Sequence, residues 1–154
     1  MKKSSILLLL FLTINFGGLA LGSWLMNNGP MTDWYLNLNK APWTPPGWVF
    51  GAAWTTIMIC FSFYLTSLFL KNYQKKKLIL YGIQVVLNIS WNYFFFNLHE
   101  VLIGFITIIL LTVLIFYFFL AYFKEQQKRS YLLLPYMIWL CIATSLNLYI
   151  LIAN

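Results

Sequence analysis

The chain reads Ala41-Pro42-Trp43-Thr44-Pro45-Pro46-Gly47-Trp48-Val49-Phe50-Gly51 where a polar connection gives way to an apolar segment. Proline restricts φ and disfavours helix in the residue before it, so the first half of this stretch is predicted to be extended. Pro46 stands where a helix can begin, because the first turn does not need its N–H. Trp43 and Trp48 carry the amphipathic rings expected at the headgroup level of a membrane. A rigid aromatic segment of this kind is typical of the mouth of a ligand site.

The composition around this segment is that of an integral membrane protein. Hydrophobic residues make up 62% of the 154 residues, charged residues 8%, and the mean hydropathy is +0.78. This composition leaves no room for a separate soluble domain, so we expect one all-α transmembrane domain over residues 1–154. Cys60 and Cys141 both fall in apolar runs and are interpreted as small core residues.

Five segments are long and apolar enough to span a bilayer, which takes about 20 residues. They are Ser5–Met26, Gly47–Leu70, Leu78–Asn97, Val101–Phe123 and Tyr131–Ala153. The first connection is long, and we expect it to cover a pocket in the five-helix bundle. A cleaved signal peptide is the alternative for the first segment, although its apolar run is longer than an ordinary signal core.

The basic residues predict the orientation of this bundle. Nine lie on the side of the N-terminus and of the second and fourth connections, whereas Lys40 alone lies on the other side. The positive-inside rule therefore places the N-terminus in the cytoplasm and the C-terminus outside. It also explains the net charge of +7 without nucleic acid as a partner.

The predicted spans carry no ionisable group well inside them, and Asp33, His99 and Glu100 fall in connections. Ion-coupled carriers usually need such groups in the membrane. No metal site can be assembled either, because clustered His, Cys or carboxylate ligands are missing from the sequence. We therefore expect no conventional acid–base or nucleophilic catalysis.

The third span has one polar and aromatic stripe at helical spacing, made of Tyr81, Gln84, Asn88, Trp91, Asn92 and Phe95. Side-chain amides in hydrocarbon need partners, so the stripe must face other helices or a cavity. Hydrogen bonds between helices are one interpretation, and we favour them for Gln84. Amides beside aromatic rings also suit an apolar ligand with a few polar edges, so both interpretations stay open for the cluster of Asn88, Trp91 and Asn92. Phe95 is a further candidate ligand contact on this stripe.

Two further spans offer tryptophans at matching depth. Trp54 lies about two turns into the second span, and the fifth carries Trp139 one turn before Ala143. Three indoles from different helices are better explained by a shared cavity than by packing alone. Above them, Thr32 is predicted to cap a short helix over Asp33–Asn39 that closes the cavity.

These residues resemble the translocator protein family, also called TspO, tryptophan-rich sensory proteins or peripheral-type benzodiazepine receptors. The resemblance rests on Trp34-Tyr35, the Trp-Thr-Pro-Pro-Gly element from Trp43, Trp54, Asn88-x-x-Trp91, and Pro135-Tyr136-x-x-Trp139-x-x-x-Ala143. It implies a five-helix bundle, usually dimeric, that binds porphyrins such as protoporphyrin IX. The family's ligand contacts fall on Tyr35, Pro42, Trp54, Asn88, Trp91, Trp139 and Ala143.

The resemblance also implies a chemistry, since some bacterial members degrade protoporphyrin in light. The two tryptophans required there correspond to Trp54 and Trp139, and the porphyrin is ligand rather than cofactor. Two other functions stay open: a transporter of porphyrin or another apolar molecule, and a membrane sensor acting through a partner. The sterol motif of animal members needs a basic residue after Tyr149, which this chain lacks.

Overall fold

The computed structural model describes residues 2–154, and long helices dominate it. The five long helices are α1 (Lys3–Leu25), α3 (Gly47–Lys71), α4 (Lys75–Asn92), α5 (Val101–Gln126) and α6 (Leu134–Ala153). Four short elements complete the described chain: η1 (Gly29–Met31), α2 (Asp33–Asn37), the π-helical η2 (Tyr93–Asn97) and the 3₁₀-helical η3 (Gln127–Leu133).

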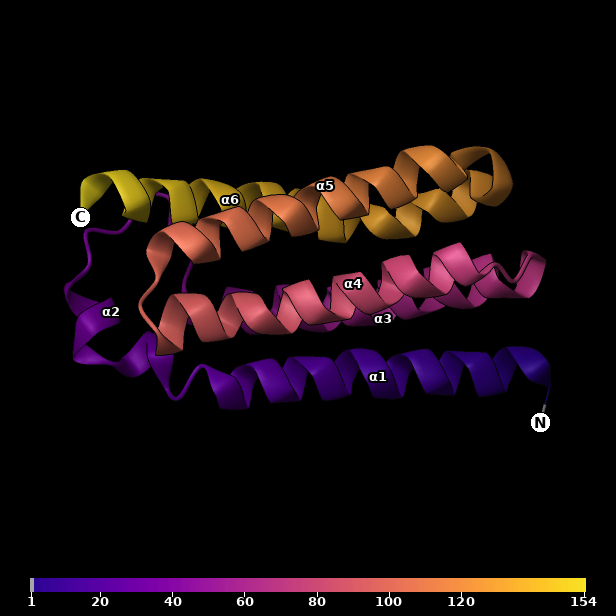
Figure 1. The fold of residues 1–154 in the computed structure, drawn as a ribbon, viewed down its shortest axis with the longest axis horizontal. Coiled ribbons are helices and arrows are strands. Elements are labelled where there is room, and N and C mark those ends of the chain that lie inside the picture. Colours follow the sequence, from indigo (N-terminus) through magenta and orange to yellow (C-terminus); the bar gives the residue numbers. More distant parts are fainter. Residues whose placement is uncertain (1) are drawn as a thin grey trace.

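All five long helices belong to segments that can cross a membrane by length and hydropathy. The spans are Lys3–Met31, Gly47–Lys71, Lys75–Asn97 and the continuous run Val101–Ala153. That last run contains both α5 and α6, because η3 follows α5 without a break. Figure 1 shows α5 and α6 side by side and antiparallel, so the run crosses twice. The predicted five-helix bundle is therefore confirmed.

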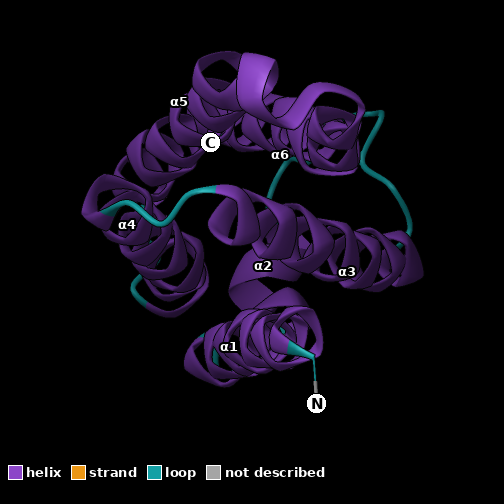
Figure 2. Cartoon of the chain, turned by 90° about the vertical axis from the view of Figure 1, so that its right-hand side faces the viewer, coloured by secondary structure: helices purple, strands orange, loops and turns teal. Residues whose placement is uncertain are grey.

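The helices form a closed ring in which α1 packs on α3 and α4, α5 packs on α4 and α6, and α6 returns to α3 (Figure 2). We call the end that holds residues 26–46 and 97–100 the loop end. The opposite end, with residues 2–3, 71–77 and 124–133, is the lysine end (Figure 1).

The apolar core lies mainly in the half of the bundle near the lysine end, around α3. Phe61 is fully buried, and its ring contacts Tyr81 of α4, Phe118 of α5 and Tyr136 of α6, with centroids 5.4–6.2 Å apart. Aromatic pairs at these separations add to the burial of their apolar area. These ring contacts hold α3, α4, α5 and α6 together, and the half of the bundle near the loop end is left for a site.

Hydrogen bonds across helices accompany this core. The Asn15 amide nitrogen donates to Ser62 Oγ at 2.8 Å, and the Tyr81 hydroxyl donates to Asn15 Oδ1 at 2.9 Å. One buried asparagine therefore ties α1 to both α3 and α4. The stripe on α4 faces inward as predicted, since Tyr81, Gln84, Asn88 and Trp91 are all buried.

Two predicted boundaries at the lysine end are wrong. The connection expected at residues 124–130 is helical, with α5 running to Gln126 and η3 following it. Lys77, expected in a connection, lies in α4 and is fully buried, with its Nζ 2.8 Å from Glu125 Oε1. Burial is tolerated because the carboxylate neutralises the ammonium and the Asn72 carbonyl accepts a further hydrogen bond at 3.0 Å.

Candidate functional site

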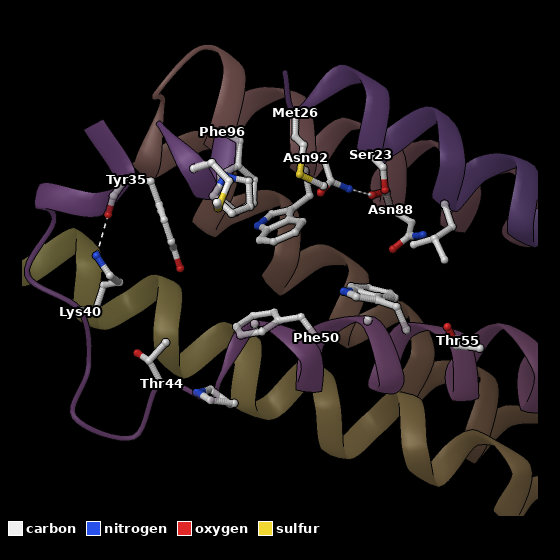
Figure 3. Close-up of a pocket in the computed structure, with 18 residues that line it drawn as sticks. Ser23, Met26, Tyr35, Lys40, Thr44, Phe50, Thr55, Asn88, Asn92 and Phe96 are labelled. Atoms are coloured by element: carbon white, nitrogen blue, oxygen red, sulfur yellow. Dashed lines mark hydrogen bonds between the residues drawn. The ribbon is translucent and has the colours of Figure 1, made fainter. Parts of the chain in front are cut away.

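A cavity of about 500 Å³ lies near the loop end, and its walls are mostly apolar (Figure 3). It is lined by Leu19, Ser23, Met26, Pro30, Met31, Tyr35, Lys40, Thr44, Pro45, Gly47, Phe50, Gly51, Trp54, Thr55, Asn88, Trp91, Asn92 and Phe96. These residues come from α1, the connection after it, α3, α4 and η2. The size and the few polar groups are those of a small-molecule site.

One wall is a face of α3 with little side-chain bulk. Gly47, Gly51 and Thr55 follow one another at intervals of four residues, and all three line the cavity. A Cβ atom added at Gly47 or Gly51 would meet nothing within 4 Å. Phe50 stands beside this face (Figure 3), and Trp54 of the same helix also lines the cavity. The half-buried Trp54 therefore borders open space along this face of α3.

The opposite wall comes from α4, where Asn88, Trp91 and Asn92 line the cavity as the stripe predicted. Asn92 donates to the Asn88 carbonyl at 3.2 Å, and the Trp91 indole N–H donates to Asn147 Oδ1 at 3.2 Å. Trp91 thus lines the cavity while its indole N–H is already paired.

Helix α6 contributes none of the lining residues, in contrast to the shared cavity predicted from three indoles. Trp139 is buried behind Phe50, with ring centroids 5.1 Å apart and planes near perpendicular. Ala143 lies one turn from Asn147 and accepts its amide hydrogen bond through the backbone carbonyl at 2.9 Å. Helix α6 supports the α3 wall from outside the cavity, because the Trp139 indole packs against the Phe50 ring of α3.

Phe95 and Pro42 also lie outside the lining. Phe95 is buried under Trp34 and stacks on Trp91, with ring centroids 5.8 Å apart, whereas its neighbour Phe96 faces the cavity. The π-helical turn of η2 shifts the register here, since the Leu98 N–H bonds back to the Tyr93 carbonyl. Such turns are frequent at functional sites.

The connection between α1 and α3 closes the loop end of the cavity. Its short helix α2 is capped by Thr32, whose hydroxyl accepts from the Tyr35 N–H at 3.4 Å, as predicted. The Trp34 ring stacks on His99 with centroids 4.1 Å apart, and the Tyr35 ring packs on Phe96 at 5.3 Å. We call residues 32–40 the lid.

Lys40 is the one charged residue of the lining, and it holds the lid together. Its Nζ donates to the carbonyls of Tyr35, Leu36 and Leu38 at 2.7–3.3 Å, which satisfies all three ammonium hydrogens. These carbonyls belong to the C-terminal end of α2, where a cation is favoured. Partial burial raises the pKa of the Tyr35 hydroxyl above its ordinary value.

The second half of the connection is anchored to α6. Residues Ala41 to Thr44 form a turn with Pro42 at its second position, closed by the Thr44 N–H on the Ala41 carbonyl at 2.9 Å. The Trp43 indole N–H donates to Ser145 Oγ at 3.1 Å. The Asn39 N–H donates to Asn154 Oδ1 at 2.9 Å. This anchoring explains why Pro42 and Trp43 shape the rim without reaching the cavity.

Sequence reasoning missed the contribution of Leu19 and Ser23 of α1 and of Met26, which directly follows that helix. It also missed Phe50, Phe96 and Lys40 as lining residues. One signal was available, because Gly18 and Gly22 mark a close approach of α1 to α4. A Cβ atom at Gly22 would lie 2.8 Å from the Asn92 amide nitrogen. Within the described chain no three His, Cys, Asp or Glu side chains gather as a metal site would require.

Comparison with known proteins agrees with this fold and cavity. Residues 9–153 match the family model described as the TspO/MBR family. The chain is 33% identical over 129 residues to the tryptophan-rich protein TspO of Chlorobaculum tepidum, which covers 81% of this chain and 82% of that protein. It is 30% identical over 115 residues to the tryptophan-rich sensory protein of Cereibacter sphaeroides, covering 75% and 73% respectively.

The similarity extends to animals, since the human translocator protein is 29% identical over 125 residues, covering 78% of this chain and 74% of that protein. The match spans the lid, the aromatic cavity and all five long helices. This chain is therefore an integral membrane protein that belongs to the TspO/MBR family.

Proposed function

We propose that this protein binds a tetrapyrrole such as protoporphyrin IX in the cavity between α1, α3 and α4. The observation that carries the proposal is the lining: the aromatic side chains of Trp54 and Phe50 from α3 and of Trp91 from α4 around a space of about 500 Å³. A flat aromatic macrocycle would stack between such rings and bury most of its surface.

The polar groups of the lining suit the edge of such a ligand. The Asn88 and Asn92 amides offer donors and acceptors to pyrrole nitrogens or to a carboxylate. The single lining charge is the cation of Lys40, and no carboxylate lines the cavity. This balance favours a ligand that is apolar over most of its surface and neutral or anionic at its edge.

We propose further that light drives oxidation of the bound porphyrin, with Trp54 as the protein group that meets it. The excited macrocycle passes its energy to dissolved dioxygen, or an electron passes from the indole through the excited macrocycle to dioxygen. The activated oxygen then adds to the macrocycle, so that dioxygen is the oxidant and the porphyrin is oxidised and consumed. Trp139 does not border the cavity, so it would act only through the Phe50 ring. The protein's contribution is placement of the ligand beside Trp54.

A porphyrin titration followed by fluorescence, in light and in the dark, tests this function. Trp54→Phe should leave binding partly intact and slow the light-dependent loss of porphyrin absorbance, and combining it with Trp139→Phe should abolish that loss. Trp48→Phe is the matched control, because Trp48 is 75% exposed on α3 and lies outside the lining. Unchanged photobleaching in the double variant would refute the photochemical role. Porphyrin flux into liposomes in the dark would instead support transport.

We also propose that the lysine end faces the cytoplasm, in a bacterial inner membrane. It gathers Lys2, Lys3, Lys71, Lys75, Lys76, Lys77, Lys124, Lys128 and Arg129, against Lys40 at the loop end. In a variant without Cys60 and Cys141, Lys128→Cys should resist modification by a membrane-impermeant thiol reagent in intact cells. Asn37→Cys, at the loop end, should be modified by the same reagent.

A further inference from the structure

A second and much smaller internal volume lies deeper in the bundle, between α1, α3 and α4. It measures about 10 Å³ and is lined by Ile14, Asn15, Gly18, Met58, Gln84, Val85 and Asn88. A space of this size is about what one water molecule needs. Asn88 borders both this volume and the large cavity.

Next to this volume, the oxygen of one buried side-chain amide lacks a hydrogen-bond partner among the described residues. The Gln84 Nε2 donates to the Tyr136 hydroxyl at 2.8 Å, but Gln84 Oε1 accepts no hydrogen bond from residues 2–154. If the oxygen and nitrogen of the Gln84 amide were exchanged, the nitrogen would be the atom without a hydrogen-bond partner, so one atom of the amide would still be unpaired. An unpaired amide atom costs most in a membrane interior, where bulk water cannot satisfy it.

The other two amides around the volume have hydrogen-bond capacity left. Asn15 uses one N–H on Ser62 and accepts from Tyr81 through Oδ1. Asn88 Oδ1 accepts from the Tyr136 hydroxyl at 3.5 Å. Each amide nitrogen carries two hydrogens, so at least one N–H on each asparagine remains to donate toward the volume. A water molecule there would have the two to four polar partners that buried waters make.

We propose that this volume is the binding site of one ordered water molecule, which donates to Gln84 Oε1 and accepts from the amide nitrogen of Asn15. It joins two separate networks, the Tyr81–Asn15–Ser62 set and the Gln84–Tyr136–Asn88 set. One hydrogen-bonded chain then links α1, α3, α4 and α6 and ends at Asn88, the amide at the back of the large cavity.

Two adjacent glycines of α1 give a matched test. Gly18 borders the small volume, and a Cβ atom there would lie 3.6 Å from Ile89 Cδ1, which is ordinary contact. Gly18→Ala should therefore fit while its methyl group displaces the water. Gly17→Ala is the control, because a Cβ atom there meets nothing within 4 Å. Both changes bring the same gain in helix propensity.

In detergent, Gly18→Ala should unfold about 3–6 °C below Gly17→Ala, as expected for one polar group left unpaired. Gln84→Met removes the group that needs the water, so on that background the difference between the two alanine variants should vanish. An unchanged difference on the Gln84→Met background would overturn the proposal.

A crystal structure of the wild-type protein at about 2 Å resolution provides the direct measurement, independent of any variant. It should show one density peak within hydrogen-bond distance of Gln84 Oε1 and of the Asn15 amide nitrogen. A Gln84 side chain turned to a protein partner, with no such peak, would contradict the proposal.

Discussion

The indole of Trp34 stacks on the imidazole of His99, with ring centroids 4.1 Å apart and planes 12° from parallel. Trp34 belongs to the lid and His99 to the connection between η2 and α5, so this pair fastens the lid to the bundle. Lys40 bonds to carbonyls of the lid itself, and Asn39 at the far end of the lid bonds to Asn154, directly after α6. Trp43, just beyond the lid, bonds to Ser145 of α6.

Removing the His99 ring should loosen the lid and speed the release of bound porphyrin. His99 has φ of 58°, so glycine removes the ring without adding backbone strain. His99→Gly should raise the dissociation rate about 2–10-fold, the range expected for one lost aromatic pair. Transfer of porphyrin to an acceptor protein measures that rate. His99→Phe keeps a ring and should release porphyrin at nearly the wild-type rate; equal acceleration in both variants would disprove the fastening.

The hydrogen bond from Trp91 to Asn147 should stabilise the cavity wall. Asn147→Leu leaves a buried indole N–H without an acceptor and should lower the free energy of unfolding by about 1–2 kcal/mol. Trp91→Phe removes the donor, so the double variant should cost less than the sum of the single ones. Thermal unfolding of the four proteins measures the coupling, and strict additivity would show that the bond contributes nothing.

The buried Lys77–Glu125 ion pair at the lysine end should contribute more to stability than the contacts of any exposed lysine nearby. Lys77→Met leaves the Glu125 carboxylate without its cation and should destabilise the protein by about 2–4 kcal/mol. Lys76→Met is the control, because Lys76 is exposed and bonds only to the Tyr117 hydroxyl. Its effect should stay within about 0.5 kcal/mol. Equal loss of stability in the two variants would contradict the importance of the pair.

Much of the fold could be predicted from the sequence because the bilayer imposes simple rules. The five apolar segments, the Thr32 cap of the lid helix and the inward stripe on α4 all follow from length, capping and periodicity. The boundary errors at the lysine end arose because charged residues were interpreted as connections. Lys77 instead buries its ammonium against Glu125, which only the folded chain brings near.

The candidate site was predicted less completely than the fold. Tyr35, Trp54, Asn88, Trp91 and Asn92 do line one cavity, but Trp139 and Ala143 lie behind its wall. Helical spacing shows which residues share a face, whereas the choice of neighbouring helix depends on packing across the bundle. Leu19 of α1 and Met26 directly after it look like ordinary membrane residues, so nothing local distinguishes them as lining.

The central claim is that a tetrapyrrole binds between α1, α3 and α4 beside Trp54, and filling that space tests it most directly. A side chain at Gly51 would project into the cavity without meeting other atoms near its Cβ, so Gly51→Leu should fold normally. Gly82→Leu is the matched control, since its Cβ also meets nothing within 4 Å and Gly82 lies outside the lining.

Titration of both variants with protoporphyrin IX in the dark, read by quenching of tryptophan fluorescence, gives the decisive comparison. Gly51→Leu should weaken binding at least about tenfold, because the added side chain occupies space that the macrocycle needs. Gly82→Leu should bind as the wild type does. Wild-type affinity in a folded Gly51→Leu protein would place the porphyrin elsewhere and contradict the central claim.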